Sequence, residues 1–114
     1  MAKPVHSMIR VFDEAKALDF YKRAFGLEVA EHLKFPDFAR ISLRHPSSPF
    51  EVELTVNKDR TNPYELGDGY GHVAVSVDDL DAEHARFEAA GLKPRKIVRR
   101  DHVICQQRFF ELQR

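Results

Sequence analysis

The residues best suited to chemistry in this chain are two histidines and two glutamates that recur in its two halves. His6 and His72 each open a valine-containing run, whereas Glu53 and Glu111 each lie late in a half of the sequence. A single histidine or glutamate on a strand is most often a solvated or hydrogen-bonded side chain, so the doubling is what makes this set informative. Imidazole and carboxylate donors together suit a borderline divalent cation such as zinc, nickel, cobalt or manganese, with positions left open for substrate oxygens. We therefore predict a metal centre.

The spacing of other residues supports an internal repeat. The two histidines are separated by 66 residues (72 − 6), and Gly26 and Gly91 by 65 (91 − 26), so one inserted residue reconciles the two spacings. In each half the histidine run leads to an acidic residue, Asp13 or the pair Asp78-Asp79, and then to a helical pattern that stops at Gly-Leu. Aspartate commonly caps the start of a helix, and glycine commonly ends one. Both halves are therefore predicted to contain strand, helix and strand.

Hydrophobic periodicity gives the positions of these elements. Helical spacing covers residues 14–25 and resumes after residue 80, while two-residue alternation predicts strands at 5–12, 27–33, 38–43, 50–56 and 72–77, with weaker candidates at 95–98 and 104–112. The polar segment 57–71 is predicted to connect the halves. Alternation places His6 and Arg10 on one face of the first strand. Glu53 lies between Val52 and Leu54 and is predicted to point away from their apolar face.

Composition and charge favour a soluble globular protein. The chain has 114 residues, 43% of them hydrophobic, and 18 basic residues balance 18 acidic ones at a pI near 7.0. This balance argues against a nucleic-acid or membrane surface as partner. Cys105 is the only cysteine, which excludes an intrachain disulfide and a thiolate metal cluster. Because no apolar run is long enough for a signal peptide or a membrane span, a cytoplasmic location is expected.

Several motifs, taken in order along the chain, resemble one known family. They are HSMIRV at 6–11, LDFY at 18–21, FGL at 25–27, ELTVN at 53–57, YELG at 64–67 and YGHVAVSVD at 70–78. Together they resemble the lactoylglutathione lyase (glyoxalase I) family of the vicinal oxygen chelate superfamily, over about residues 3–98. The order and natural spacing of the matches make this resemblance more specific than any one motif.

For the fold, the resemblance implies an α+β protein in which paired βαβββ modules form a half-open barrel, the glyoxalase/bleomycin-resistance-like arrangement. The chain would then be a single domain of two halves, about residues 1–66 and 67–114. The second module is expected to be shortened, since His6 to Glu53 spans 47 positions (53 − 6) and His72 to Glu111 only 39 (111 − 72). The family's Asp-Pro-Asp-Gly-Tyr turn before the last ligand has no counterpart here, so a hairpin is expected to be missing.

For the site, the resemblance implies one divalent metal, nickel, cobalt or zinc, bound by His6, Glu53, His72 and Glu111. Homodimers with shared sites are usual in the family, each metal being held by His and Glu from one chain and His and Glu from its partner. Glu111 is the expected catalytic base, with Glu53 as the opposed catalytic ligand. Arg10 and Asn57 match positions that hold the carboxylates of glutathione, a task that suits a guanidinium fork.

The implied activity is that of a lyase in methylglyoxal detoxification. The hemithioacetal of methylglyoxal and glutathione would isomerise to S-lactoylglutathione through an enediolate, whose two adjacent oxygens a divalent metal can chelate. Two alternatives stay open: a non-catalytic vicinal oxygen chelate protein that binds a small molecule or metal, and an epimerase of acyl-CoA thioesters. If Glu111 does not reach the metal, binding without turnover is expected. Asp101 and His102 are substitute donors, although a solvated turn is the favoured interpretation of that pair.

Overall fold

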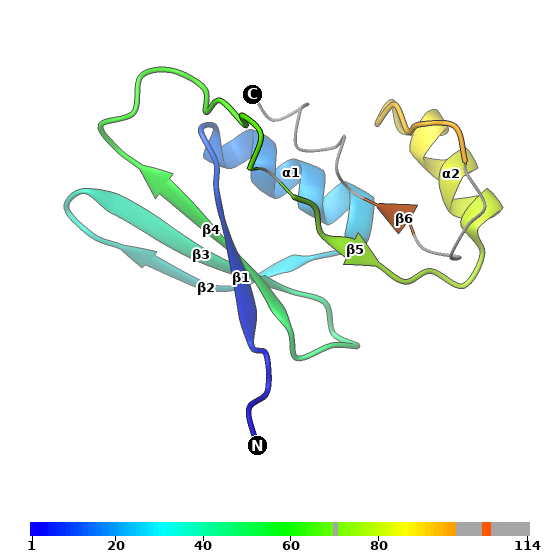
Figure 1. The fold of residues 1–114 in the computed structure, drawn as a ribbon, viewed down its shortest axis with the longest axis horizontal. Helices are drawn as coiled ribbons and strands as arrows, with labels where there is room; N and C mark the ends of the chain where they lie inside the picture. The colour runs from blue at the N-terminus through cyan, green and yellow to red at the C-terminus, as the bar shows by residue number, and fades with distance from the viewer. Residues whose placement is uncertain (70, 98–103, 106–114) are drawn as a thin grey trace. The chain divides into compact units, whose positions relative to one another are not determined.

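The computed structural model describes residues 1–69, 71–97 and 104–105 (Figure 1). Its elements in chain order are β1 (His6–Arg10), α1 (Glu14–Phe25), β2 (Glu28–Lys34), β3 (Phe38–Arg44), β4 (Glu51–Asn57), β5 (Ala74–Val75), α2 (Leu80–Ala89) and β6 (Ile104–Cys105). The described chain divides into two compact units, one covering residues 1–65 and the other beginning at residue 66. In the described ranges, no helix is long and apolar enough to cross a membrane.

The first unit is a complete βαβββ module. Its sheet has the strand order β1-β4-β3-β2, with β1 parallel to β4 and the other neighbours antiparallel. A parallel pair needs a long crossover, and here that connection contains α1 as well as β2 and β3. The α+β class and the strand, helix and strand order predicted for the first half are confirmed. Strands β1 and β2 form the two edges of this sheet.

Helix α1 begins and ends where its capping residues predict. The Asp13 side chain accepts a hydrogen bond of 3.0 Å from the backbone N–H of Lys16, and Gly26 ends the helix in the left-handed region at φ 65°. A glycine adopts that conformation without the steric cost that a Cβ atom adds. The helix buries one stripe, made of Ala17, Phe20, Tyr21 and Ala24. The prediction of a helix over residues 14–25 is confirmed.

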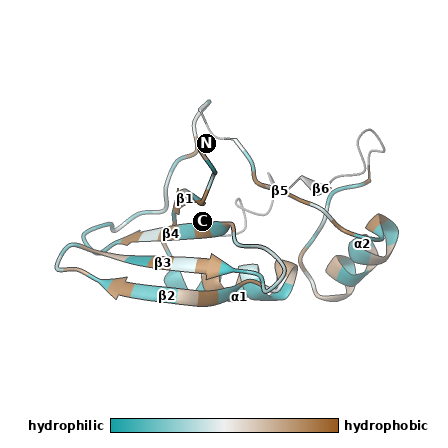
Figure 2. Cartoon of the chain, turned by 90° about the horizontal axis from the view of Figure 1, so that it is seen from below, coloured by the Kyte–Doolittle hydropathy of each residue, from teal (hydrophilic) through white to brown (hydrophobic). Residues whose placement is uncertain are grey.

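Alternation along the strands separates an apolar face from a polar one. Ile41 and Leu43 of β3 and Val52 and Leu54 of β4 are buried, and together with the α1 stripe they form the core. Burying one such side chain contributes roughly 1.5–3 kcal/mol to folding. Figure 2 shows the alternation as brown and teal bands along the strands. The opposite face is called the open face here; it presents the side chains that alternate with the core residues, Glu53 among them.

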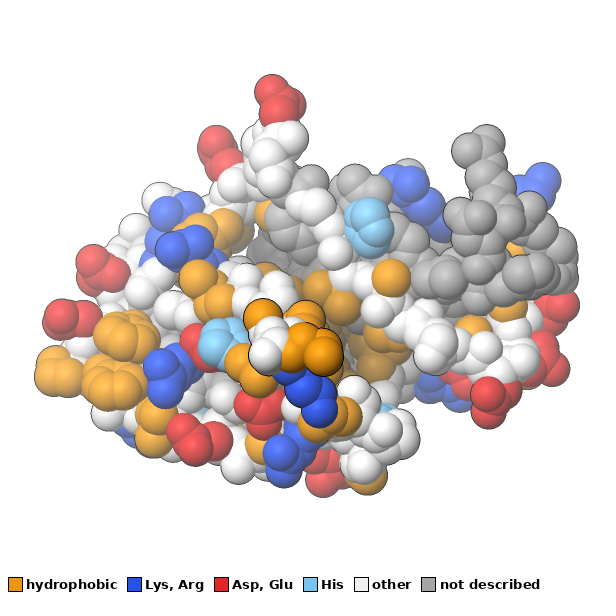
Figure 3. Space-filling model, turned by 60° about the horizontal axis from the view of Figure 1, so that its bottom comes forward, with side chains coloured by type: hydrophobic (Ala, Val, Ile, Leu, Met, Phe, Trp, Pro, Cys, Tyr) orange, Lys and Arg blue, Asp and Glu red, His pale blue; other side chains and the backbone are white. Residues whose placement is uncertain are grey.

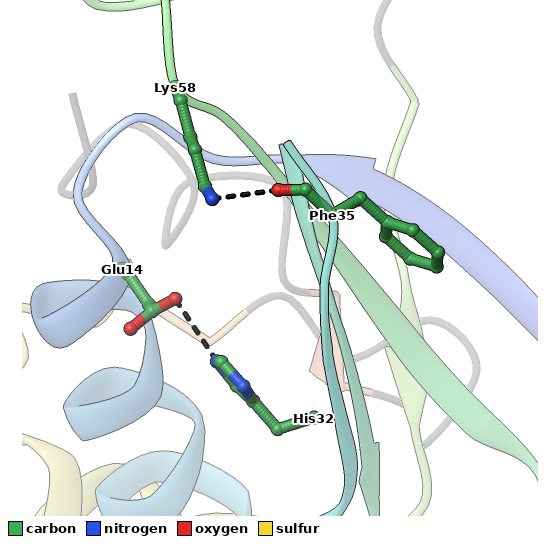
Figure 4. A network of polar contacts seen from close by, with 4 residues as sticks. All are labelled: Glu14, His32, Phe35 and Lys58. Carbon is green, nitrogen blue, oxygen red and sulfur yellow. Dashed lines mark hydrogen bonds and ion pairs between the residues drawn. The ribbon is translucent and has the colours of Figure 1, made fainter. Parts of the chain in front are cut away.

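Two polar contacts join the elements of the first unit (Figure 4). His32 Nε2 on β2 lies 3.3 Å from Glu14 Oε1 at the start of α1, and this pair connects the helix to the sheet. Lys58, just after β4, donates a hydrogen bond of 2.7 Å from Nζ to the carbonyl oxygen of Phe35 in the β2–β3 turn. One contact thus connects β2 to α1, and the other connects the turn after β2 to the residue after β4.

The second unit contains β5, α2 and β6. Asp79 caps α2 through a 3.0 Å hydrogen bond from the backbone N–H of Ala82, and Phe87 and Leu92 are its buried apolar residues among those described. The prediction of a strand over 72–77 was too long, because β5 covers Ala74 and Val75, and residues 72–73 and 76–77 are not assigned to a strand. Among the described residues, β5 pairs with Ile104 and Cys105 of β6. Exposure still alternates across this segment, with residues 73, 75 and 77 less exposed than residues 72, 74 and 76.

The weaker strand predictions near the C-terminus are partly wrong. Residues 95–97 form no strand, and the carbonyl oxygen of Arg95 is bonded instead to His84 Nε2 of α2 at 2.7 Å. Of the candidate at 104–112, Ile104 and Cys105 form β6; residue 98 and residues 106–112 lie outside the described residues.

Candidate active site

His6 and Glu53 come together because β1 and β4 run side by side in parallel. In their register His6 lies beside Glu51, and Met8 lies beside Glu53, so the imidazole reaches Glu53 along a diagonal. His6 Nε2 is 3.3 Å from Glu53 Oε2. The Glu53 side chain is 12% exposed and the His6 side chain 47% exposed, so the carboxylate is the more enclosed partner. The predicted orientation of Glu53, away from the apolar face, is confirmed.

Arginines on β3 approach the carboxylates of β4 from the other side. Arg40 Nε lies 3.9 Å from Glu53 Oε1, and Arg44 lies 3.7 Å from Glu51 Oε2. These side chains surround a hollow of about 380 Å³ on the open face, lined by His6, Ala30, Glu31, Arg40, Ser42, Arg44, Glu51 and Glu53. In the space-filling view, acidic, basic and histidine side chains lie close together on the face presented (Figure 3). Of the lining residues, Ala30 alone is apolar, so this hollow suits a charged or oxygen-rich ligand.

A second hollow of about 400 Å³ lies at the other end of β1 and brings Arg10 together with Asn57. Asn57 Nδ2 donates a hydrogen bond of 2.8 Å to the hydroxyl of Tyr64. The guanidinium of Arg60 lies 4.1 Å from the centre of the Tyr64 ring. Arg60 also donates hydrogen bonds to the carbonyl oxygens of residues 62 and 63, at 2.7 and 3.0 Å, which closes the loop after β4.

Of the remaining predicted ligands, the structure describes His72. His72 belongs to the second unit, where it is exposed. Glu111, like Asp101 and His102, lies outside the described residues. Within the described ranges, no group of three or more His, Cys, Asp or Glu side chains could hold a metal ion. His6 and Glu53 nevertheless present an imidazole nitrogen and a carboxylate oxygen to each other, which are two donors of the kind that zinc, nickel and cobalt accept.

The sequence also matches a known family. A model of the glyoxalase/bleomycin resistance protein/dioxygenase superfamily matches residues 3–110. The chain belongs to this superfamily.

Two curated relatives of the chain are named lactoylglutathione lyase. The lactoylglutathione lyase of Neisseria meningitidis serogroup A is 37% identical to this chain over 91 residues, which cover 76% of this chain and 65% of the relative. The lactoylglutathione lyase of Haemophilus influenzae is 32% identical over 91 residues, covering 76% of this chain and 67% of the relative. The matched part of the chain thus spans about two thirds of the length of these enzymes.

Solved structures show the same fold. The trypanothione-dependent glyoxalase I of Leishmania major superposes with a TM-score of 0.77 at 25% identity, covering 92% of this chain and 78% of that one. A glyoxalase I of Zea mays superposes with a TM-score of 0.68 at 26% identity, over 78% of this chain and 33% of that one. The glyoxalase-like α+β fold, predicted from the sequence motifs, is therefore confirmed.

The structure also identifies residues that the sequence patterns did not single out. Arg40 contacts Glu53, and Tyr64 holds Asn57. Alternation along 38–43 already placed Arg40 on the polar face of its strand, but its contact with Glu53 depends on the register between β3 and β4. The role of Tyr64 depends on the path of an irregular loop, for which periodicity gives no signal.

Proposed function

We propose that this chain is a metal-dependent isomerase of the glyoxalase I type, which converts the hemithioacetal of methylglyoxal and glutathione to S-lactoylglutathione in the cytoplasm. The observation that supports this most directly is the pairing of His6 Nε2 with Glu53 Oε2 at 3.3 Å on the open face. The relatives named lactoylglutathione lyase support the reaction class.

The spacing of the two hollows fits a glutathione adduct. His6 and Arg10 lie on the same face of β1, four positions apart, which corresponds to about 13 Å along a strand. An extended tripeptide spans roughly 10–11 Å. The reacting carbons could therefore lie near His6 and Glu53 while a peptide carboxylate reaches Arg10 and Asn57. A charge-assisted hydrogen bond from Arg10 would hold that carboxylate.

His6 and Glu53 would supply half of the metal site, and His72 and Glu111 the other half. We place the two halves in different chains of a homodimer with shared sites. A divalent cation, nickel, cobalt or zinc, would stabilise negative charge on two adjacent substrate oxygens. Glu111 would remove and return the proton next to the carbonyl, and Glu53 would face the substrate from the opposite side. A positioned carboxylate base typically contributes about 10²–10⁴-fold in rate.

An assay of thioester formation from methylglyoxal and glutathione tests the proposal. We expect turnover by metal-loaded protein, its loss after chelation, and its loss in Glu53→Gln. Glu51→Gln is the comparison variant: Glu51 lies on the same face of the same strand but pairs with Arg44, so we expect its loss to reduce turnover less than Glu53→Gln does. Metal binding without turnover would point to a non-catalytic binding protein. Turnover of an acyl-CoA thioester in place of the glutathione adduct would point to an epimerase.

A further inference from the structure

The charge balance around Glu53 carries an inference about Arg40. Glu53 is 12% exposed, and an ionised carboxylate so far removed from water needs a neighbouring positive charge. His6 is charged only when protonated, whereas the guanidinium of Arg40 is permanently charged. Arg40 Nε lies 3.9 Å from Glu53 Oε1, so a fixed countercharge stands beside the carboxylate.

The sheet register places Arg40 and His6 on opposite diagonals of Glu53. On β1 the residue beside Glu53 is Met8, with His6 two positions earlier. On β3 the residue beside Glu53 is Ser42, with Arg40 two positions earlier, and β3 runs antiparallel to β4. His6 therefore approaches from the Glu51 side and Arg40 from the opposite side. Each carboxylate oxygen has its own partner, Oε2 with His6 and Oε1 with Arg40.

A cation bound between His6 and Glu53 would meet the guanidinium as a like charge. The two positive groups would share one carboxylate, and each would weaken the other's attraction to it. Arg40 is 42% exposed, and its long side chain can move its charged end into water while its stem stays on the sheet. The ion pair between Arg40 and Glu53 can therefore break and form again at low energetic cost.

We propose that Arg40 is a positioning residue that holds Glu53 in the metal-free protein and competes with the divalent cation for it. This inference rests on the proposed function, since it takes His6 and Glu53 as metal ligands. In the metal-free state Arg40 fixes Oε1 and leaves Oε2 facing His6, so the two donors are already oriented. When the metal binds, Arg40 gives up the carboxylate and becomes available to an anionic group in the same hollow.

The test is calorimetric titration of the metal-free full chain with Ni²⁺, and separately with Zn²⁺, for wild type, Arg40→Gln, Arg40→Lys and Arg44→Gln. Arg40→Gln removes the competing charge, and we expect it to bind metal about two- to fivefold more tightly, the range for a partly exposed ion pair. Arg40→Lys keeps the charge and should bind within about twofold of wild type. Arg44→Gln removes a charge from the same strand face that pairs with Glu51 instead of Glu53, and we expect it to change metal affinity less than Arg40→Gln does.

Thermal unfolding provides a second measurement. We expect Arg40→Gln to lower the melting temperature of the metal-free protein by about 2–4 °C, and to lower that of the metal-saturated protein by less. A residue that merely supports the sheet would lower both equally. Equal or weaker metal binding by Arg40→Gln, beside a wild type that binds metal, would overturn the role of Arg40 and leave the proposed function standing. A wild type that binds neither metal would overturn both.

Discussion

Glu53 Oε2 lies 3.3 Å from His6 Nε2, across a pair of parallel strands that are separated by a helix and two further strands in sequence. The contact exists because the βαβββ module returns its last strand beside its first. Toward the other end of β1, Arg10 and Asn57 of the same strand pair line one hollow. One parallel strand pair thus carries both the imidazole and carboxylate that we propose as metal ligands and a candidate binding site for an anion.

Arg10 is predicted to bind substrate and to contribute little to the chemical step. We expect Arg10→Gln to raise KM for the glutathione adduct about 10- to 100-fold with little change in kcat, because a hydrogen bond to a charged group contributes about 1.5–3 kcal/mol. Steady-state kinetics measures this. Arg23→Gln on α1, where Arg23 pairs with Asp19 at 3.3 Å, should leave both constants unchanged. An equal fall of kcat and kcat/KM in Arg10→Gln would assign Arg10 to the transition state instead.

Tyr64 is predicted to position Asn57. Tyr64→Phe removes the hydroxyl that accepts the 2.8 Å hydrogen bond but keeps the ring beneath Arg60. We expect an increase of about two- to tenfold in the dissociation constant of an S-alkyl glutathione, the range for one neutral hydrogen bond. Calorimetry measures the binding. Tyr64→Leu also removes the ring and should weaken binding further; if the two variants match wild type, Tyr64 has no such role.

Leu54 is predicted to be a main stabilising residue of the first unit. It is fully buried on β4, between the two polar positions Glu53 and Thr55. We expect Leu54→Ala to lower the free energy of unfolding by about 2–5 kcal/mol, as the removed atoms leave a cavity. Denaturant titration measures this. Thr55→Ala on the open face is the control, and a loss as large as that of Leu54→Ala would contradict the assigned faces of the sheet.

Asp13 is predicted to stabilise α1 as its N-cap. Asp13→Ala leaves the N–H of Lys16 without its side-chain acceptor and should cost about 0.5–2 kcal/mol in unfolding free energy. Asp19→Ala, which removes only the exposed ion pair with Arg23, should cost roughly 0.5 kcal/mol or less. The decisive result is a larger loss of unfolding free energy in Asp13→Ala than in Asp19→Ala. Equal losses would contradict the capping role of Asp13.

Much of the first unit could be predicted from local patterns. The span from Asp13 to Gly26 predicts the helix because capping is a local property, and alternation in β3 and β4 predicts which side chains are buried. The contact between His6 and Glu53 could not come from alternation, since 47 positions separate them (53 − 6). The recurrence of His and Glu in the two halves, together with the motif resemblance, implied that these residues act together.

Features that depend on strand partners were harder to predict. The valine-rich segment from His72 to Val77 alternates well, yet β5 is two residues long. Periodicity describes one strand, whereas length and register belong to a pair. For the same reason the neighbourhood of Arg40 and Glu53 follows from the β3–β4 register. The participation of His72 and Glu111 in the metal site stays a prediction.

The most direct test is anomalous diffraction from crystals grown with nickel or zinc. We expect one metal peak about 2.0–2.2 Å from both His6 Nε2 and a Glu53 carboxylate oxygen, with His72 and Glu111 of a second copy of the chain completing the shell. Protein that turns over the glutathione adduct while its bound metal lies elsewhere, or while His6 and Glu53 contact only each other, would contradict it.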